Sequence, residues 1–191
     1  SANFIKEYNK KIAYNDFRNN MITLIAFAFQ QRGFRVLILC SRIGHGNDIL
    51  KRFLSADIEC TFISGKDSRE DKNDATTGFL QSEKGSILIA SDIFKKGKTL
   101  PQANVLINAA SQTKESVVIQ RRGRVLGASD GKDYAIICDF DDQVKSTTQQ
   151  HSQHRIAVYE NLVQKKSVEK IFRIDYNKCD LCDEIIKTLK V

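Results

Sequence analysis

Short apolar runs alternate with longer amphipathic stretches along this chain, and the alternation predicts its fold. Five runs are rich in Ile, Val and Leu and contain few polar residues. They lie at 35–40, 57–63, 86–90, 104–109 and 133–140. Such runs are typical of strands that are covered on both faces. Helical stretches are predicted between them at 46–55, 68–82 and 114–126. Strands that alternate with helices predict a three-layer α/β domain with a mainly parallel sheet.

The two ends of the chain differ from this middle part. Residues 1–32 predict an N-terminal helical segment, in which Asn20 caps a helix that ends at Gly33. After Asp142 the sequence becomes polar and predicts a helical C-terminal extension over 143–191. We therefore expect three parts: a leading segment (1–32), an α/β domain (33–142) and the extension (143–191).

Composition narrows the class of protein. The 191 residues include 30 basic and 23 acidic side chains, a net charge of +7, which favours a polyanionic partner. No apolar run is long enough to span a bilayer, so we expect no membrane partner. The chain begins with Ser1 instead of methionine, from which we expect it to be a piece of a longer protein. Three of its five cysteines lie in strand-like runs, which predicts a reducing compartment, the cytoplasm or the nucleic-acid compartment of a host cell.

The stretch VIQRRGRVLG, residues 118–127, combines an apolar run with a cationic cluster. On a helix, Gln120 and Arg124 share one face, and planar guanidinium groups grip phosphate bidentately. A solvated basic face remains an equal alternative on this stretch alone.

Three further stretches accompany it in a fixed order. QRRGRVLG resembles motif VI of superfamily 2 helicases, Q-R-x-G-R-x-x-R, and residues 87–110 are similar to motif V. Residues 35–53 resemble motif IV with its helix, and 61–79 resemble the segment that follows, where a glycine turn precedes a helix. Together the four motifs resemble the C-terminal RecA-like lobe of a superfamily 2 DNA helicase, of the phage or XPB-like group.

The resemblance implies half of a motor, in which ATP and Mg²⁺ bind between two lobes and are held mainly by the first. It implies that Arg124 is the catalytic arginine that reaches the γ-phosphate. It assigns Gln120, Arg121 and Gly97 to ATP binding. The partners implied are DNA, with RNA not excluded, and a first RecA-like lobe of the same polypeptide.

The resemblance also implies a surface that follows the phosphates of a nucleic acid without reading its sequence. The residues at the matching positions are Ser41, Arg42, Gly65, Lys66, Ser91, Lys95 and Lys96.

Two residues depart from the family pattern. Gly127 replaces the final arginine of motif VI, and Thr99 stands where many members have an aspartate that contacts the ribose. The sequence also contains neither a G-x-x-x-x-G-K-[ST] phosphate loop nor a D-E-x-x motif after a strand.

We therefore expect the second motor lobe of an ATP-dependent DNA helicase or translocase, with no ATP hydrolysis by this chain alone. The alternative is a non-catalytic nucleic-acid-binding or protein-docking module derived from a helicase. A free-standing nucleotide-dependent enzyme is the least favoured, because no glycine-rich loop follows the first strand.

Metal binding is not expected. His151 and His154 could join Cys179 and Cys182 in a zinc site, but no hairpin signal frames the four residues. The acidic residues of the DFDD stretch, at 139–142, are expected to be polar turn residues at the end of a strand.

Overall fold

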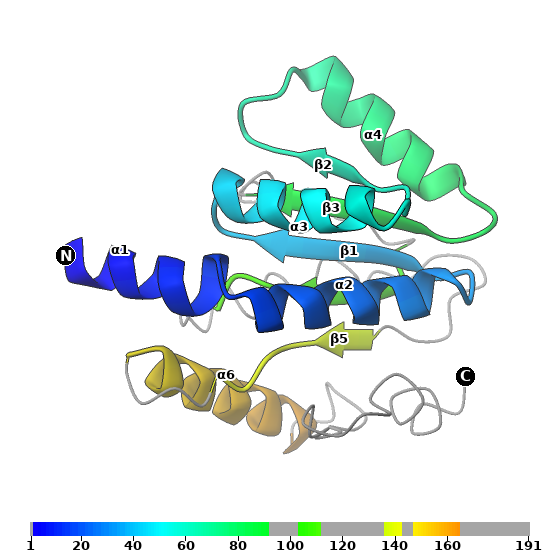
Figure 1. The fold of residues 1–191 in the computed structure, drawn as a ribbon. Coiled ribbons are helices and arrows are strands. Elements are labelled where there is room, and N and C mark those ends of the chain that lie inside the picture. The colour runs from blue at the N-terminus through cyan, green and yellow to red at the C-terminus, as the bar shows by residue number, and fades with distance from the viewer. Residues whose placement is uncertain (1, 92–102, 112–135, 143–146, 165–191) are drawn as a thin grey trace.

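A computed structural model describes residues 2–91, 103–111, 136–142 and 147–164 (Figure 1). The helices of this part are α1 (Ala2–Tyr8), the π-helix η1 (Asn9–Ala13), α2 (Asp16–Gln30), α3 (Ile43–Ser55), α4 (Arg69–Gln81) and α6 (Thr147–Gln164). The strands are β1 (Arg35–Cys40), β2 (Thr61–Ile63), β3 (Ser86–Ser91), β4 (Val105–Asn108) and β5 (Ile136–Cys138).

These strands form one parallel sheet in the order β2-β3-β1-β4-β5. The pairing brings Cys40 opposite Ser91 and Leu39 opposite Asn108, so β1, β3 and β4 end at the same level. In Figure 1 the arrows point toward the end of the sheet where α1 lies. The predicted α/β class with a parallel sheet is therefore confirmed.

The two faces of the sheet are covered by different helices, because side chains alternate along each strand. Val36, Ile38 and Cys40 pack with α2 and α3, whose buried side chains include Phe29 and Phe53. On the other face, Leu37 and Leu88 pack with Phe79 of α4. Strands covered on both faces explain why the runs showed no polar alternation.

Helix α2 begins earlier than the sequence predicted. Its N-cap is Asn15, whose side chain accepts a hydrogen bond from the Arg18 backbone N–H at 3.0 Å, and Asn20 lies inside the helix. The assignment of Asn20 as the cap was wrong, because Arg18 and Asn19 are buried through contacts with distant parts of the chain.

The end of α2 follows the prediction. Gly33 has a φ of +82°, the left-handed conformation that glycine adopts without strain. The Gly33 N–H bonds to the Gln30 carbonyl and the Phe34 N–H to the Phe29 carbonyl, which is a Schellman motif. The rings of Phe29 and Phe34 then pack edge to face, with their centres 5.6 Å apart.

Other predicted elements agree in position and differ at their ends. Helix α4 starts with a capping box between Ser68 and Asp71, within the start of the predicted helix 68–82. Strand β2 begins at Thr61, four residues after the start of the predicted run 57–63. The predicted helix 114–126 lies outside the described residues. Within the part of the chain that the structure describes, no helix has the length and apolar character needed to cross a membrane.

Candidate functional site at the carboxyl edge of the sheet

The carboxyl ends of parallel strands meet at one edge of a sheet, which is where α/β proteins bind ligands. Ser41 and Arg42 follow β1, Gly65 and Lys66 follow β2, and Ser91 ends β3. Because β2, β3 and β1 are neighbours, the structure brings these five predicted contact residues to one stretch of this edge. Their role as nucleic-acid contacts stays a prediction.

The turn after β2 is held by its own polar groups. The Asp67 carboxylate accepts from the Ser64 N–H at 2.5 Å, and the Ser64 hydroxyl accepts from the Lys66 N–H at 3.2 Å. Lys72 of α4 donates to the Gly65 carbonyl at 3.3 Å. Gly65 itself is exposed, and a Cβ built on it would meet nothing within 4 Å. These hydrogen bonds hold the turn in place, while Gly65 and Lys66 are open to solvent. The backbone of a ligand can therefore approach these two residues.

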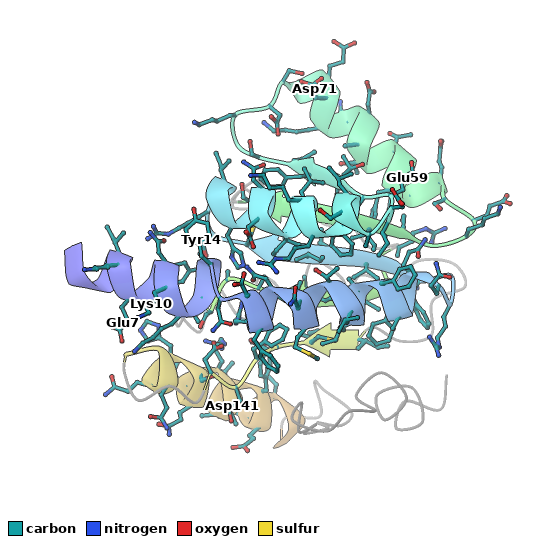
Figure 2. The ribbon with its side chains drawn as sticks, in the orientation of Figure 1. Glu7, Lys10, Tyr14, Glu59, Asp71 and Asp141 are labelled. Atoms are coloured by element: carbon teal, nitrogen blue, oxygen red, sulfur yellow. The ribbon has the colours of Figure 1, made fainter. Side chains whose placement is uncertain are left out.

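Arg42 is held by the N-terminal segment. Its guanidinium carbon lies 4.9 Å from the centre of the Tyr8 ring, and its Nη1 donates to the Asn9 side chain at 3.1 Å. Tyr8 in turn donates through its hydroxyl to the Ala110 carbonyl, after β4, at 2.8 Å. Figure 2 shows other side chains of this segment, among them Lys10 and Tyr14, at the same end of the sheet. Tyr8 and Asn9 thus contribute to the candidate site, which the sequence did not predict.

The two serines of the site differ in their surroundings. Ser41 is partly buried, with its hydroxyl 3.5 Å from the Ala110 carbonyl. Ser91 is only 1% exposed, and its hydroxyl has no hydrogen-bond partner among the described residues. An unpaired hydroxyl in this position costs folding free energy.

A buried ionic network that the sequence did not predict lies beyond the ends of β4 and β5. Arg18 of α2 pairs with Asp142 at 3.0 Å, and Arg155 of α6 pairs with Asp139 at 3.1 Å and with Asp142 at 3.4 Å. Both arginines are at most 5% exposed. The sequence contained a sign that these arginines are buried. Arg18 and Arg155 lie one helical turn before the buried residues Ile22 and Val158, on the apolar face of each helix.

Asp139 and Asp142 therefore serve as partners of arginines. Burial lowers the pKa of Arg155, but the Asp139 and Asp142 carboxylates outweigh burial and raise this pKa above its ordinary value. Asp139 also accepts from the Tyr159 hydroxyl at 2.8 Å and from the Asn108 amide at 2.9 Å. The acidic stretch follows β5, as the sequence suggested, but Asp139 and Asp142 are partners of buried arginines instead of polar turn residues.

His45 is buried between α2 and α3. Its Nε2 lies 3.0 Å from the Asn19 side-chain oxygen, while the Asn19 amide nitrogen donates to the Asp48 carboxylate at 2.8 Å. Nε2 therefore carries the proton. Burial, and then the charge of Arg18, lower the pKa of His45 to about 3. His45 is neutral at physiological pH and serves as a buried hydrogen-bond donor.

The remaining sequence predictions concern metal binding and residues outside the described part of the chain. Among the described residues, no group of three His, Cys, Asp or Glu side chains could hold a metal ion. Eight residues named above lie outside the described part of the chain: Lys95, Lys96, Gly97, Thr99, Gln120, Arg121, Arg124 and Gly127. Cys179 and Cys182 also lie outside it.

Comparison with known families decides the class of this protein. The model of the helicase conserved C-terminal domain matches residues 19–129, more than half of the chain. The chain belongs to this family. The helicase domain match begins inside α2 and ends at residue 129, and the boundaries at 32 and 142 stay predictions.

Individual relatives agree with this assignment. The ATP-dependent DNA helicase uvsW of Enterobacteria phage T4 is 23% identical over 157 residues, which cover 82% of this chain and 31% of that helicase. The crystal structure of T4 UvsW matches with a TM-score of 0.64 at 21% identity, over 82% of this chain and 35% of that chain. This chain therefore spans about a third of the length of the T4 helicase.

A second group of structures has the same fold. The C-terminal domain of the DEAD-box protein Dbp5 matches with a TM-score of 0.67 at 14% identity, over 93% of this chain and 94% of that domain. S. cerevisiae Dbp5 bound to RNA and ADP BeF3 matches with a TM-score of 0.65 at 15% identity, over 91% of this chain and 41% of that chain. These matches establish the RecA-like fold of the helicase C-terminal domain for this chain.

Proposed function

We propose that this helicase C-terminal domain is the second motor lobe of an ATP-dependent superfamily 2 DNA helicase or translocase. It binds the backbone of a nucleic acid at the carboxyl edge of its sheet and completes the ATP site of a first lobe. The family assignment and the named activity of the T4 relative, an ATP-dependent DNA helicase, support this proposal.

The observation that carries the proposal is the gathering of Ser41, Arg42, Gly65, Lys66 and Ser91 at one edge. The turn at Gly65 and Lys66 is exposed and held by its own hydrogen bonds, so it offers an accessible backbone at Gly65 and the cation of Lys66 without rearranging. Contacts of this kind position a phosphate backbone and carry no base information. The net charge of +7 adds long-range attraction for a polyanion.

The ATP side of the proposal depends on Gln120, Arg121, Arg124 and Gly97. These residues would bring guanidinium groups and a close backbone approach to a nucleotide whose phosphates and Mg²⁺ the first lobe holds. Bound ATP and Mg²⁺ would supply the phosphoryl group and the charge neutralisation of hydrolysis. The contribution of this chain would be to stabilise the charge that develops on the γ-phosphoryl oxygens.

The binding half can be tested on this chain with a matched pair of lysine variants. Lys66→Ala removes a cation at the carboxyl edge, after β2, and Lys84→Ala removes an exposed cation at the amino edge, before β3. Lys66→Ala should weaken binding equally for unrelated DNA sequences and flatten the salt dependence by about one unit. Lys84→Ala should leave both unchanged. Equal effects of the two variants would show that the carboxyl edge is not the binding surface. Tighter binding of an RNA of the same sequence would show that the ligand is RNA instead of DNA.

The ATP half is tested in the polypeptide that also carries the first lobe. Arg124→Ala should lower kcat far more than it raises the KM for ATP, because an arginine finger acts mainly on the transition state. Full turnover in this variant would favour the non-catalytic nucleic-acid-binding or docking module.

A further inference from the structure

The ionic network joins two places that flank the stretch 112–135, which contains the arginines of motif VI. Ser111 is the last described residue before this stretch, and Asp139 and Asp142 follow soon after it. The Ser111 hydroxyl donates to the Asp142 carboxylate at 2.8 Å. The chain is therefore tied together on both sides of the stretch.

Helix α6 supplies most of this tie. Arg155 donates from Nη1 to the Ser111 hydroxyl at 3.2 Å, and its Nε and Nη2 reach Asp139 and Asp142. The ring of His151, one turn earlier on α6, hydrogen-bonds to the Ser111 backbone. One side chain thus contacts the residue before the stretch and both carboxylates after it.

Ser111 is held in a conformation that serine rarely adopts. Its φ is +48°, in the left-handed region, and it is only 2% exposed. Such a conformation persists where the surroundings over-determine it. Here β4 fixes the chain before Ser111, and Arg155, Asp142 and His151 fix its side chain and backbone. Helix α6 therefore holds the chain at Ser111, the last described residue before the stretch.

Helix α2 braces the same place from the other side. Arg18 donates from Nη1 to the Ala109 carbonyl at 2.8 Å and from Nε to Asp142 at 3.0 Å. Two arginines and two aspartates therefore share the network, and their formal charges cancel. Nη2 of Arg18 has no hydrogen-bond partner among the described residues, but removing any one of the four side chains would leave a buried charge unpaired.

We propose that Arg155 is a positioning residue for the motif VI stretch, which it serves by holding Ser111 and Asp142 together. The inference rests on the proposed function, because the position of Arg124 matters only if that side chain must reach a nucleotide held by another lobe. Displacing a catalytic group by about 1 Å can cost on the order of a hundredfold in rate, so a distant anchor can control turnover.

Two variants of this anchor and one control separate positioning from general stability. Arg155→Lys keeps the charge and loses the planar guanidinium that reaches three partners at once. Ser111→Ala leaves Arg155 paired with both carboxylates and removes the two hydrogen bonds of the Ser111 hydroxyl, to Arg155 and to Asp142. Arg52→Lys is the control, because Arg52 also bonds two carboxylates, Asp16 and Asp48, but only joins α2 to α3.

The first measurement is hydrogen exchange of this chain. Peptides within 112–135 should exchange at least about threefold faster in both anchor variants, while peptides of β1 and β3 keep their rates, because local opening precedes global unfolding. Arg52→Lys should leave the 112–135 peptides unchanged. Unchanged exchange of these peptides in both anchor variants would overturn the inference.

The second measurement is ATP hydrolysis by the two-lobed polypeptide. Both anchor variants should lower kcat by about tenfold or more, with the KM for ATP and the affinity for nucleic acid within about twofold of their original values. Arg52→Lys should keep its kcat within about twofold. Faster exchange with unchanged kcat would show that Arg155 and Ser111 hold the stretch 112–135 but do not affect ATP hydrolysis. This result would count against the proposed function. Equal loss of kcat in the control would show a general effect of stability and overturn the positioning role.

Discussion

Gly46 of α3 lies against the ring of Phe62 on β2, with no room between them for a side chain. A Cβ on residue 46 would be 2.6 Å from the Phe62 Cζ atom, closer than carbon atoms can approach. We predict that Gly46→Ala destabilises the domain by about 1–3 kcal/mol through this overlap, even though alanine favours a helix. Urea unfolding measures the change. Equal or greater stability would show that Phe62 moves aside freely.

Gly78 of α4 is the matched case in which the opposite result is expected. It lies inside the helix, is exposed, and a Cβ there would meet nothing within 4 Å. Gly78→Ala should therefore stabilise the domain by about 0.5–1 kcal/mol, since alanine loses less backbone entropy on folding than glycine. The same urea titration compares the two variants. Destabilisation at Gly78 would show that α4 is not a regular helix at this residue.

Ser91 should show a conflict between stability and binding. Its buried hydroxyl has no partner within the described part of the chain, so Ser91→Ala should raise the free energy of unfolding by about 1 kcal/mol. If the hydroxyl bonds a phosphate when nucleic acid is present, the same variant should bind DNA about threefold to tenfold more weakly. Thermal unfolding and fluorescence anisotropy measure the two effects. A stabilised variant with unchanged affinity would limit Ser91 to a packing role.

His45 should make the domain less stable in acid. Its pKa of about 3 in the folded state lies below the ordinary value of 6.5, so below pH 6.5 the unfolded chain takes up a proton that the folded chain does not. Stability that is present above pH 6.5 is then lost as the pH falls toward 3, by at most about 1.4 kcal/mol per pH unit. His45→Gln, whose amide can still donate to Asn19, should remove this part of the pH dependence. The comparison requires unfolding titrations between pH 7 and pH 4, and equal slopes for both proteins would contradict the burial of a neutral imidazole.

Cys60 and Cys138 should be unreactive thiols. Burial raises the pKa of each to about 12, and the Asp139 carboxylate adds to this shift for Cys138. At pH 8 the thiolate is the reactive form, so alkylation should be about a thousandfold slower than for an ordinary cysteine. Mass spectrometry of peptides after iodoacetamide treatment measures the rates, with the urea-unfolded chain as the reference. Labelling of the folded chain at the reference rate would mean that the segments around Cys60 and Cys138 open readily.

Local pattern was enough to predict the class of fold. The apolar runs at 35–40 and 86–90 correspond to β1 and β3, and the capping residue Ser68 begins α4, because strand burial and helix capping leave a signature within a few residues. The four motifs also led to the helicase family, which the match over 19–129 then established. The resemblance assigned Ser41, Gly65 and Ser91 to one surface, and the structure has them at the ends of three neighbouring parallel strands.

Local pattern failed where a polar residue is paired with a distant partner. Asn20 precedes an apolar run and looked like a cap, but α2 starts at Asp16 because the buried Arg18 and Asn19 find partners in Asp142 and Asp48. The contact between the Tyr8 ring and the Arg42 guanidinium was missed for the same reason.

The sequence by itself determined that this chain forms a parallel α/β domain with helicase motifs, because periodicity and motif spacing are properties of neighbouring residues. Only the tertiary structure decided that Arg18 and Arg155 meet at Asp142, and that Arg155 of α6 bonds to Ser111. Nothing in the residues around either arginine specifies its partner. A buried charge is stable only where an opposite charge and hydrogen bonds meet it, and the fold of the whole chain decides where that is.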